Sequence, residues 1–168
     1  MKSLSLFLFL CLLAVASFAQ TTPVEKTASV PFTNIYAGGI SFNNSASPEV
    51  AGSGLYARLV NPSSGTYAFT VVDALPTTVK PFTVTSNFSG GVAQKVFSVA
   101  GIPIFVPTSA GVSFNGPNTG WAWSTGAIAP IKLKNNWYAY PNVRTLRSNV
   151  AHGSGYQLIV GLFFGWAK

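Results

Sequence analysis

His152 and Ser154 are the side chains whose types and spacing point most directly to chemistry. His152 is the sole histidine of the sequence, and histidine is the side chain whose usual pKa lies near neutrality. A histidine so close to a serine could take the hydroxyl proton as a general base and make the serine oxygen a nucleophile. The alternative, which the surrounding residues favour, is an ordinary histidine in a polar loop from Ser148 to Gly155.

The third member of such a catalytic set is missing from the neighbourhood. No Asp or Glu follows Asp73 in the sequence, so a group that orients His152 would have to be Glu49, Asp73 or the amide of Asn149. We therefore expect no turnover and keep His152 and Ser154 as an alternative catalytic pair.

Metal and cofactor chemistry is poorly supported. The sequence holds three acidic residues, Glu25, Glu49 and Asp73, and these together with one histidine do not form a local set of metal ligands. The glycine pairs Gly38–Gly39 and Gly90–Gly91 lack the lysine and the following helix of a phosphate loop. They indicate tight strand packing or bulges instead. The expectation is no metal and no cofactor.

The N-terminus resembles a secretory signal. Lys2 precedes an apolar run from Leu4 to Val15, and Ser17-Phe18-Ala19 offers small residues for cleavage after Ala19. A membrane anchor is the alternative, but the run is shorter than the roughly 20 residues that cross a bilayer. We predict a signal peptide over residues 1–19 and a short polar leader over residues 20–31. Cys11 would leave with the signal, so the mature chain would contain no thiol.

The charge balance argues against nucleic acid as a partner. Removing Lys2 leaves nine basic and three acidic residues, a net charge of +6, and the basic residues do not cluster. An exported protein of this kind more plausibly meets anionic lipid or lipopolysaccharide phosphate. The alternative is that the scattered Lys and Arg lie in loops and in the interior of the fold.

The segment from Tyr156 to Trp166 carries the strongest structural pattern. Every second residue from Tyr156 to Trp166 is large and apolar, with an aromatic at each end, whereas the other register is smaller and mixed. Side chains on a strand alternate between faces, so one face of this strand is continuously apolar.

Eight segments of this kind can be placed, and no segment holds a helical period. Longer and shorter connections alternate between them, as in an up-and-down barrel. The segments are approximately Phe32–Asn43, Gly54–Val60, Thr66–Ala74, a part of Phe82–Val99, Ile104–Phe114, Trp121–Leu133, Trp137–Leu146 and Gly155–Trp166. Within the fourth, Asn87 to Gly91 could be a bulge or a break. Pro107 in the fifth indicates a bulge.

The apolar strand faces suit a membrane protein better than a water-soluble one. Charged residues make up 8% of the sequence, too few to cover a soluble β protein. A sheet in a membrane must close, and its aromatics gather at the two interfaces. We predict an all-β fold, an eight-stranded antiparallel up-and-down transmembrane β-barrel over residues 32–168. Its predicted interfacial aromatics are Trp121, Trp123, Trp137, Tyr156 and Trp166. The opposite faces, rich in Gly, Ala, Ser and Thr, predict a narrow polar lumen.

These features together resemble the small outer-membrane β-barrels of the OmpA/OmpX type. Gly161, Phe164 and Trp166 match the spacing of that group's C-terminal insertion signal, although Ile159 and the final Ala167-Lys168 depart from it. The resemblance implies a location in the bacterial outer membrane, insertion by the barrel-assembly machinery, and a structural or surface-interaction role.

Three other functions remain open at this point. The His-x-Ser sequence resembles that of outer-membrane lipid A deacylases, which would make His152 the base and Ser154 the nucleophile, although Gly155 replaces their asparagine. Arg58, Lys95, Lys132 and Arg144 in a hydrated lumen, where they would need Asp73, hydroxyls or water as partners, would suit a solute conduit. A secreted soluble β-barrel or sandwich is the third.

Overall fold

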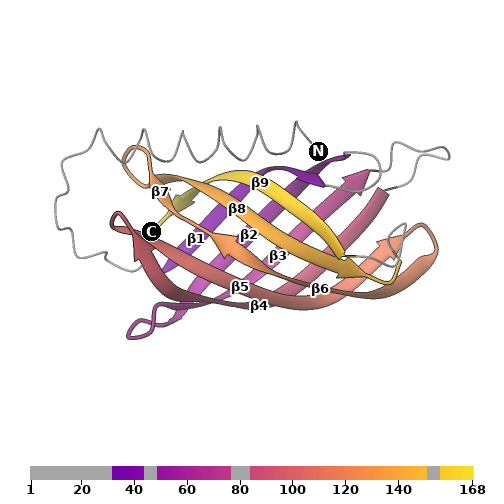
Figure 1. Cartoon of the computed structure of the whole chain (residues 1–168), viewed down its shortest axis with the longest axis horizontal. Coiled ribbons are helices and arrows are strands. Elements are labelled where there is room, and N and C mark those ends of the chain that lie inside the picture. The colour runs from indigo at the N-terminus through magenta and orange to yellow at the C-terminus, as the bar shows by residue number, and fades with distance from the viewer. Residues whose placement is uncertain (1–31, 44–48, 77–83, 151–155) are drawn as a thin grey trace. The chain divides into compact units, whose positions relative to one another are not determined.

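The strands of this protein form one antiparallel sheet whose two ends meet. The computed structural model describes residues 32–43, 49–76, 84–150 and 156–168. Strands that follow one another pair, except β6 and β7. Because β1 also pairs with β9 and β6 pairs with β8, the sheet forms a ring. Figure 1 shows the long strands running obliquely, side by side. The strands are β1 (Asn34–Asn43), β2 (Glu49–Asn61), β3 (Thr66–Pro76), β4 (Val84–Val99), β5 (Ile102–Asn115), β6 (Asn118–Ile128), β7 (Ile131–Lys132), β8 (Trp137–Ser148) and β9 (Tyr156–Ala167).

The prediction of an all-β antiparallel fold is confirmed, but the prediction of eight strands is not. The described residues form nine strands, because the predicted segment Trp121–Leu133 is divided into β6 and β7 at Ala129 and Pro130. Proline has no backbone N–H to donate to a ladder, so pairing stops there. The two-residue β7 pairs with β8 through Ala139 and Tyr138 alone.

The irregularities of β4 and β5 lie elsewhere than predicted. Strand β4 runs without a break through Asn87 to Gly91, and its pairing with β5 shifts between Lys95 and Phe97 instead. On the side of β5 that faces β4, Pro107 is paired with Ala93 without a shift in register. On the other side of β5, the pairing with β6 lapses between Phe105 and Thr108.

The closure of the ring depends on glycines at close approaches between strands. A Cβ at Gly39 would collide with the backbone of Leu162 and Phe163 on β9, and a Cβ at Gly91 would collide with Thr108 and Ser109 on β5. The expected tight strand packing is confirmed at these two positions. Neither would accept a side chain without separating the two strands.

The ring has two distinguishable ends. The first, here named the terminal end, holds the start of β1 and the end of β9, the turns 62–65 and 100–101, and residues 129–136. The second, the loop end, holds the turn 116–117, the ends of β1, β3 and β8, and the starts of β2, β4 and β9. No helix in the described ranges is long and apolar enough to cross a membrane.

The interior consists of two apolar zones with a polar zone between them. Near the loop end, Leu75, Leu146 and Ile159 form a small buried cluster. Toward the terminal end, a larger group surrounds Tyr67, Phe69, Tyr140 and Phe163. The predicted polar lumen is therefore wrong for much of the interior length. Tyr67, Phe69 and Val71 of β3 point inward, because a filled ring of this size needs bulky side chains.

Candidate functional site

The outer face of the sheet is predominantly apolar. On β9, Leu162 and Phe164 are exposed while the intervening Phe163 is buried, so the strand turns its apolar face outward. The same alternation exposes Phe42 on β1, Val72 on β3 and Phe88 on β4. Exposed large apolar side chains thus occur on β1 to β6, β8 and β9. Exposed apolar surfaces of this extent are typical of regions that contact a protein partner, a ligand or a membrane.

Aromatic side chains occur near both ends of this surface. Near the terminal end, the ring centroid of Tyr36 lies 5.0 Å from that of Tyr56 and 6.2 Å from that of Trp166. Trp137 opposes Trp166 in register beside them. Near the loop end, the centroids of Trp123 and Tyr156 are 5.7 Å apart, with Trp121 on the same strand as Trp123.

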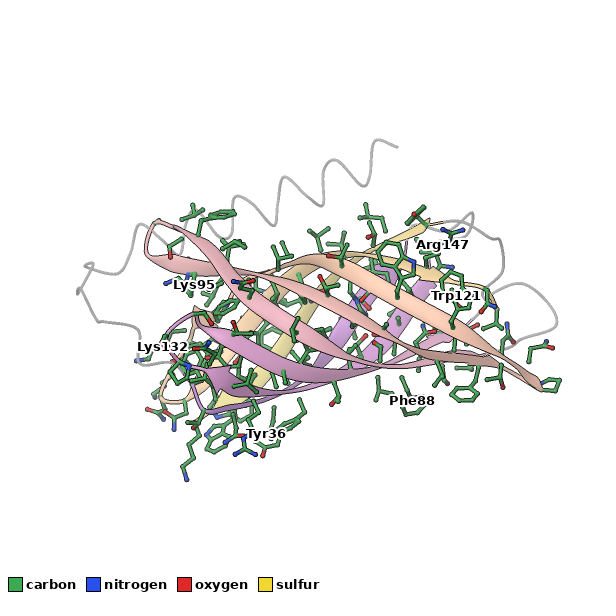
Figure 2. The ribbon with its side chains drawn as sticks, turned by 90° about the horizontal axis from the view of Figure 1, so that it is seen from below. Tyr36, Phe88, Lys95, Trp121, Lys132 and Arg147 are labelled. Carbon is green, nitrogen blue, oxygen red and sulfur yellow. The ribbon has the colours of Figure 1, made fainter. Side chains whose placement is uncertain are left out.

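The exposed charged side chains lie near the ends as well. Figure 2 shows Lys95 and Lys132 at one end and Arg147 toward the other. The Arg147 guanidinium carbon is 5.6 Å from the centroid of Trp121 and 5.3 Å from that of Tyr156. These are cation–π distances, which hold the charge against the aromatic group. Between the two ends, the outer face of the described strands carries no charged side chain.

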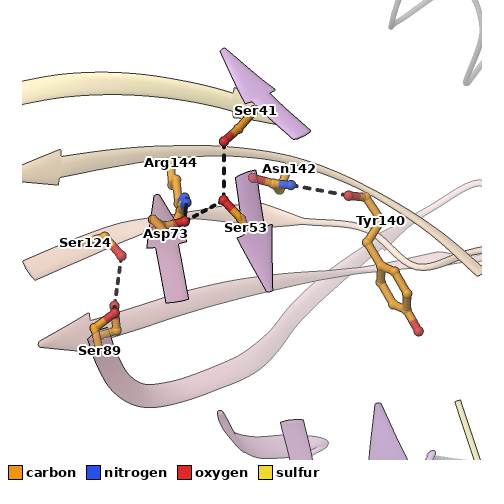
Figure 3. Close-up of polar contacts among 9 residues, drawn as sticks. Ser41, Ser53, Asp73, Ser89, Ser124, Tyr140, Asn142 and Arg144 are labelled. Carbon is orange, nitrogen blue, oxygen red and sulfur yellow. Dashed lines mark hydrogen bonds and ion pairs between the residues drawn. The ribbon is translucent and has the colours of Figure 1, made fainter. Parts of the chain in front are cut away.

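The interior polar zone centres on an ion pair. Arg144 Nη2 of β8 donates to Asp73 Oδ1 of β3, and both side chains are buried. Ser53 Oγ of β2 donates to the same carboxylate oxygen at 2.6 Å, and Ser41 Oγ of β1 lies 3.4 Å from Ser53 Oγ. Figure 3 shows this chain of contacts crossing the ring. Hydrogen bonds and an opposite charge are what a buried carboxylate requires.

A second set of polar contacts continues around the same level of the ring. Ser109 Oγ of β5 donates to Ser89 Oγ at 3.2 Å and lies 2.8 Å from Ser124 Oγ of β6. Ser113 Oγ donates to Asn87 Oδ1 at 2.6 Å. Small hydroxyl side chains fill this narrow level while satisfying one another.

A cavity of about 80 Å³ lies between the polar zone and the terminal end. Its walls are mostly apolar, with Phe69, Phe105, Ile128 and Phe163 among them. Asn142 and Arg144 line its inner end. Apolar walls with a few polar groups at one end are typical of a small-molecule site.

The structure separates the four cations that were predicted to line the lumen. Arg144 lies inside, as expected, and is neutralised by Asp73. Arg58 is exposed on the outer face, so the prediction is wrong for this residue. Lys95 and Lys132 oppose the inward-facing Phe105 and Tyr138 and therefore share the inward register, but both are exposed near the terminal end. Arg58 follows the outward register of Tyr56 and Val60, and the two lysines lie where β4 and β7 end.

The residues of the predicted insertion signal share β9 but face opposite ways. Phe164 and Trp166 point outward, whereas Gly161 faces Ser41 and Asn142 in the interior. The alternative catalytic pair, His152 and Ser154, lies outside the described residues. No cluster of three His, Cys, Asp or Glu occurs in the described ranges.

Sequence reasoning offered Asp73 as one partner for lumen cations, but it did not single out Arg144 from the four candidates or place the pair at the centre of the interior. A signal was available, because Asp73 lies in the same strand register as Tyr67, Phe69 and Val71, and that register is buried. A lone carboxylate in a buried register demands a cation.

Comparison with known proteins leaves the family open. No protein-family model and no curated protein matches the chain. Among solved structures, a chain described as "De novo design of transmembrane beta-barrels" aligns with a TM-score of 0.49 at 14% sequence identity, covering 80% of this chain and 96% of that chain. A likeness at this level says nothing about ligands or activity.

Proposed function

We propose that this protein is a transmembrane β-barrel of the bacterial outer membrane with a structural or surface-interaction role and no turnover. The observation that carries the proposal is the outer face, which is apolar between two ends that hold aromatics and cations. Lipid-facing surfaces of membrane barrels have this arrangement.

The length of the apolar band suits a bilayer. Tyr156 and Trp166 mark its two edges on β9 and are ten residues apart. At a rise of ~3.4 Å per residue and a tilt of ~40°, ten residues cover ~26 Å along the membrane normal, close to the band of known outer-membrane barrels. Eight of the nine strands are long enough to cross, and β7 is not.

The chemistry of the two ends supports an orientation. In the proposal the terminal end faces the periplasm and the loop end faces outward, since the start of β1, the end of β9 and the two short turns 62–65 and 100–101 lie at the terminal end. Arg147 beside Trp121 and Tyr156 would then meet lipopolysaccharide phosphate. Gly161, Phe164 and Trp166 would present the insertion signal to the barrel-assembly machinery, and the predicted signal peptide would bring the chain to the periplasm.

The filled interior favours this role over a solute conduit. Side chains from opposite strands meet at the polar zone, where Arg144 contacts Asp73. The bulky Tyr67, Phe69, Tyr140 and Phe163 lie beyond it. An eight-stranded ring is just wide enough for side chains to fill.

Membrane fractionation combined with gel mobility tests the proposal. The full chain is expressed in a Gram-negative host, and the outer-membrane fraction is run on SDS gels with and without boiling. A closed barrel should resist SDS until heated, so the two samples should migrate differently. Recovery in the soluble periplasmic fraction, with one mobility under both conditions, would contradict the proposal.

A further inference from the structure

The cavity near the terminal end reaches a weak place in the wall. Between Phe105–Ile128 and Thr108–Thr125, the register sets Val106 against Ala127 and Pro107 against Gly126, but β5 and β6 do not pair at these two positions. Equal numbers of residues stand on both strands, so the interruption is a lapse in pairing and not a bulge. Pro107 lacks an N–H, which removes one donor from the ladder at this point.

The cavity lining shows that this interruption opens onto the cavity. Pro107, Ala127 and Pro130 all line the cavity. Ala127 does so even though Trp123 and Thr125, which share its register on β6, belong to the outer face. Within the described residues, β7 pairs with β8 alone. From Phe105 toward the terminal end, the edge of β5 that faces β6 therefore has no partner strand among the described residues. We call the stretch between Val106–Pro107 and Gly126–Ala127 the seam. In a membrane, the seam faces hydrocarbon.

The other end of the cavity is polar and incompletely satisfied. Asn142 Oδ1 and Arg144 Nε belong to buried residues that line this end, whereas the ring of Tyr140, which also lines the cavity, points away from them (Figure 3). Within the described part of the protein, neither Asn142 Oδ1, Arg144 Nε nor Tyr140 Oη has a hydrogen-bond partner. An unpaired buried polar group costs free energy, and a ligand that supplies a partner recovers that cost. The set includes both donors and acceptors.

The charge of the interior restricts the ligand. Arg144 is already neutralised by Asp73, and among the described residues no further charged side chain is buried. Lys95 and Lys132 share the inward register but are exposed to water near the terminal end. A ligand with a charged head would bring an uncompensated charge out of water, which is costly. A hydroxyl or carbonyl head could satisfy the free atoms without that cost.

We propose that the cavity binds an uncharged, single-chain amphiphile with a hydroxyl or carbonyl head. The head lies at Asn142 and Arg144, and the hydrocarbon chain passes Phe105 and Ile128 to the seam, where it meets the membrane. The cavity, at about 80 Å³, is smaller than an engineered cavity of ~150 Å³ that admits benzene. It therefore holds the first carbons of the chain, and the rest extends through the seam. This inference rests on the proposed membrane location.

Photolabelling in lipid vesicles tests this site. The full-length protein is exposed to a 1-decanol derivative that carries a diazirine near the hydroxyl, with and without excess 1-decanol, and the labelled residues are mapped by mass spectrometry. Saturable labels are expected on cavity residues at the head position, such as Asn142 and Arg144. Ala93→Leu places a larger side chain in the cavity and should lower these labels about tenfold. The matched control, Ala110→Leu on the outward face of β5, should leave them unchanged.

Three outcomes would overturn the inference. The first is labelling confined to the outer face. The second is equal cavity labelling in the Ala93→Leu and Ala110→Leu proteins. The third is competition by decanoate at neutral pH as strong as that by 1-decanol. The heat-dependent gel shift is measured on the same samples. A protein that shows the shift but no cavity label refutes the inference alone, whereas the absence of the shift refutes the membrane proposal.

Discussion

Arg144 on β8 and Asp73 on β3 form an ion pair across the full width of the ring. In either direction around the sheet, three strands lie between β3 and β8: β2, β1 and β9 on one side, and β4, β5 and β6 on the other. The pair therefore connects opposite walls, and Ser53 and Ser41 extend it toward β1. Residues 71 positions apart in sequence set the width of the interior at this level.

Removing one partner of this pair should be far more costly than removing both. Arg144→Met leaves the Asp73 charge buried without a counter-ion, and we expect it to lower the free energy of unfolding by about 3–5 kcal/mol. The double variant Asp73→Leu with Arg144→Met has no buried charge and should lose much less. Urea unfolding of the refolded barrels in lipid vesicles measures both. Equal losses in the single and double variants would mean that the buried charge is not the cause.

Two glycines on neighbouring strands should respond oppositely to a methyl group. Gly39→Ala directs a Cβ into the backbone of β9, whereas Gly54→Ala on β2 meets no atom within 4 Å. We expect Gly39→Ala to destabilise the fold by about 1–3 kcal/mol and to refold in lower yield. Gly54→Ala should be neutral or stabilising by about 0.5–1 kcal/mol, because alanine restricts the unfolded chain and glycine does not. The fraction of heat-shifting protein after refolding compares them.

A cation on the outer face should be tolerated only near an end of the strands. Leu162 lies between Tyr156 and Trp166 on β9, and Leu162→Arg should cost about 2–4 kcal/mol in a bilayer. Val99, the last residue of β4 at the terminal end, is equally outward, and Val99→Arg should cost about 0–1 kcal/mol. Unfolding in lipid vesicles gives both values. Similar small losses at the two positions would indicate that water covers the whole outer face.

The protein should not conduct ions across a planar bilayer. The polar zone is filled by side chains that bond to one another, and its central arginine is paired with Asp73. We expect no stepwise conductance from the purified full chain under a holding potential, with a known porin as the positive control. Reproducible single-channel steps, whether selective for cations or anions, would show that the interior opens.

The apolar strand faces were predictable from the sequence, but the direction in which each face looks was not. The large residues alternate on β9 and on β3 alike, yet Phe164 points outward and Phe69 inward. Lipid and a packed interior both accept large apolar side chains, so local alternation alone does not distinguish them. Whether an apolar face points inward or outward depends on how much interior volume the closed ring leaves at that height along the strands.

The interior site depended on relationships that sequence does not display locally. Asp73 and Arg144 meet only because the ring closes, and the seam exists only because Pro107 and Gly126 fall opposite one another in the register of β5 and β6. Pro107 was recognised as an irregularity, but its effect on the β6 side required the pairing pattern. His152 and Ser154 stay a prediction, because they lie outside the described residues.

Tryptophan quenching by brominated lipids tests the membrane-spanning proposal most directly. All four tryptophans, Trp121, Trp123, Trp137 and Trp166, lie on the outer face near one end or the other of the strands. In vesicles, bromines near the glycerol region should quench their fluorescence strongly, and bromines at the bilayer centre should quench it less. Fluorescence that no membrane-embedded bromine quenches would contradict the account, because these side chains would then not contact lipid.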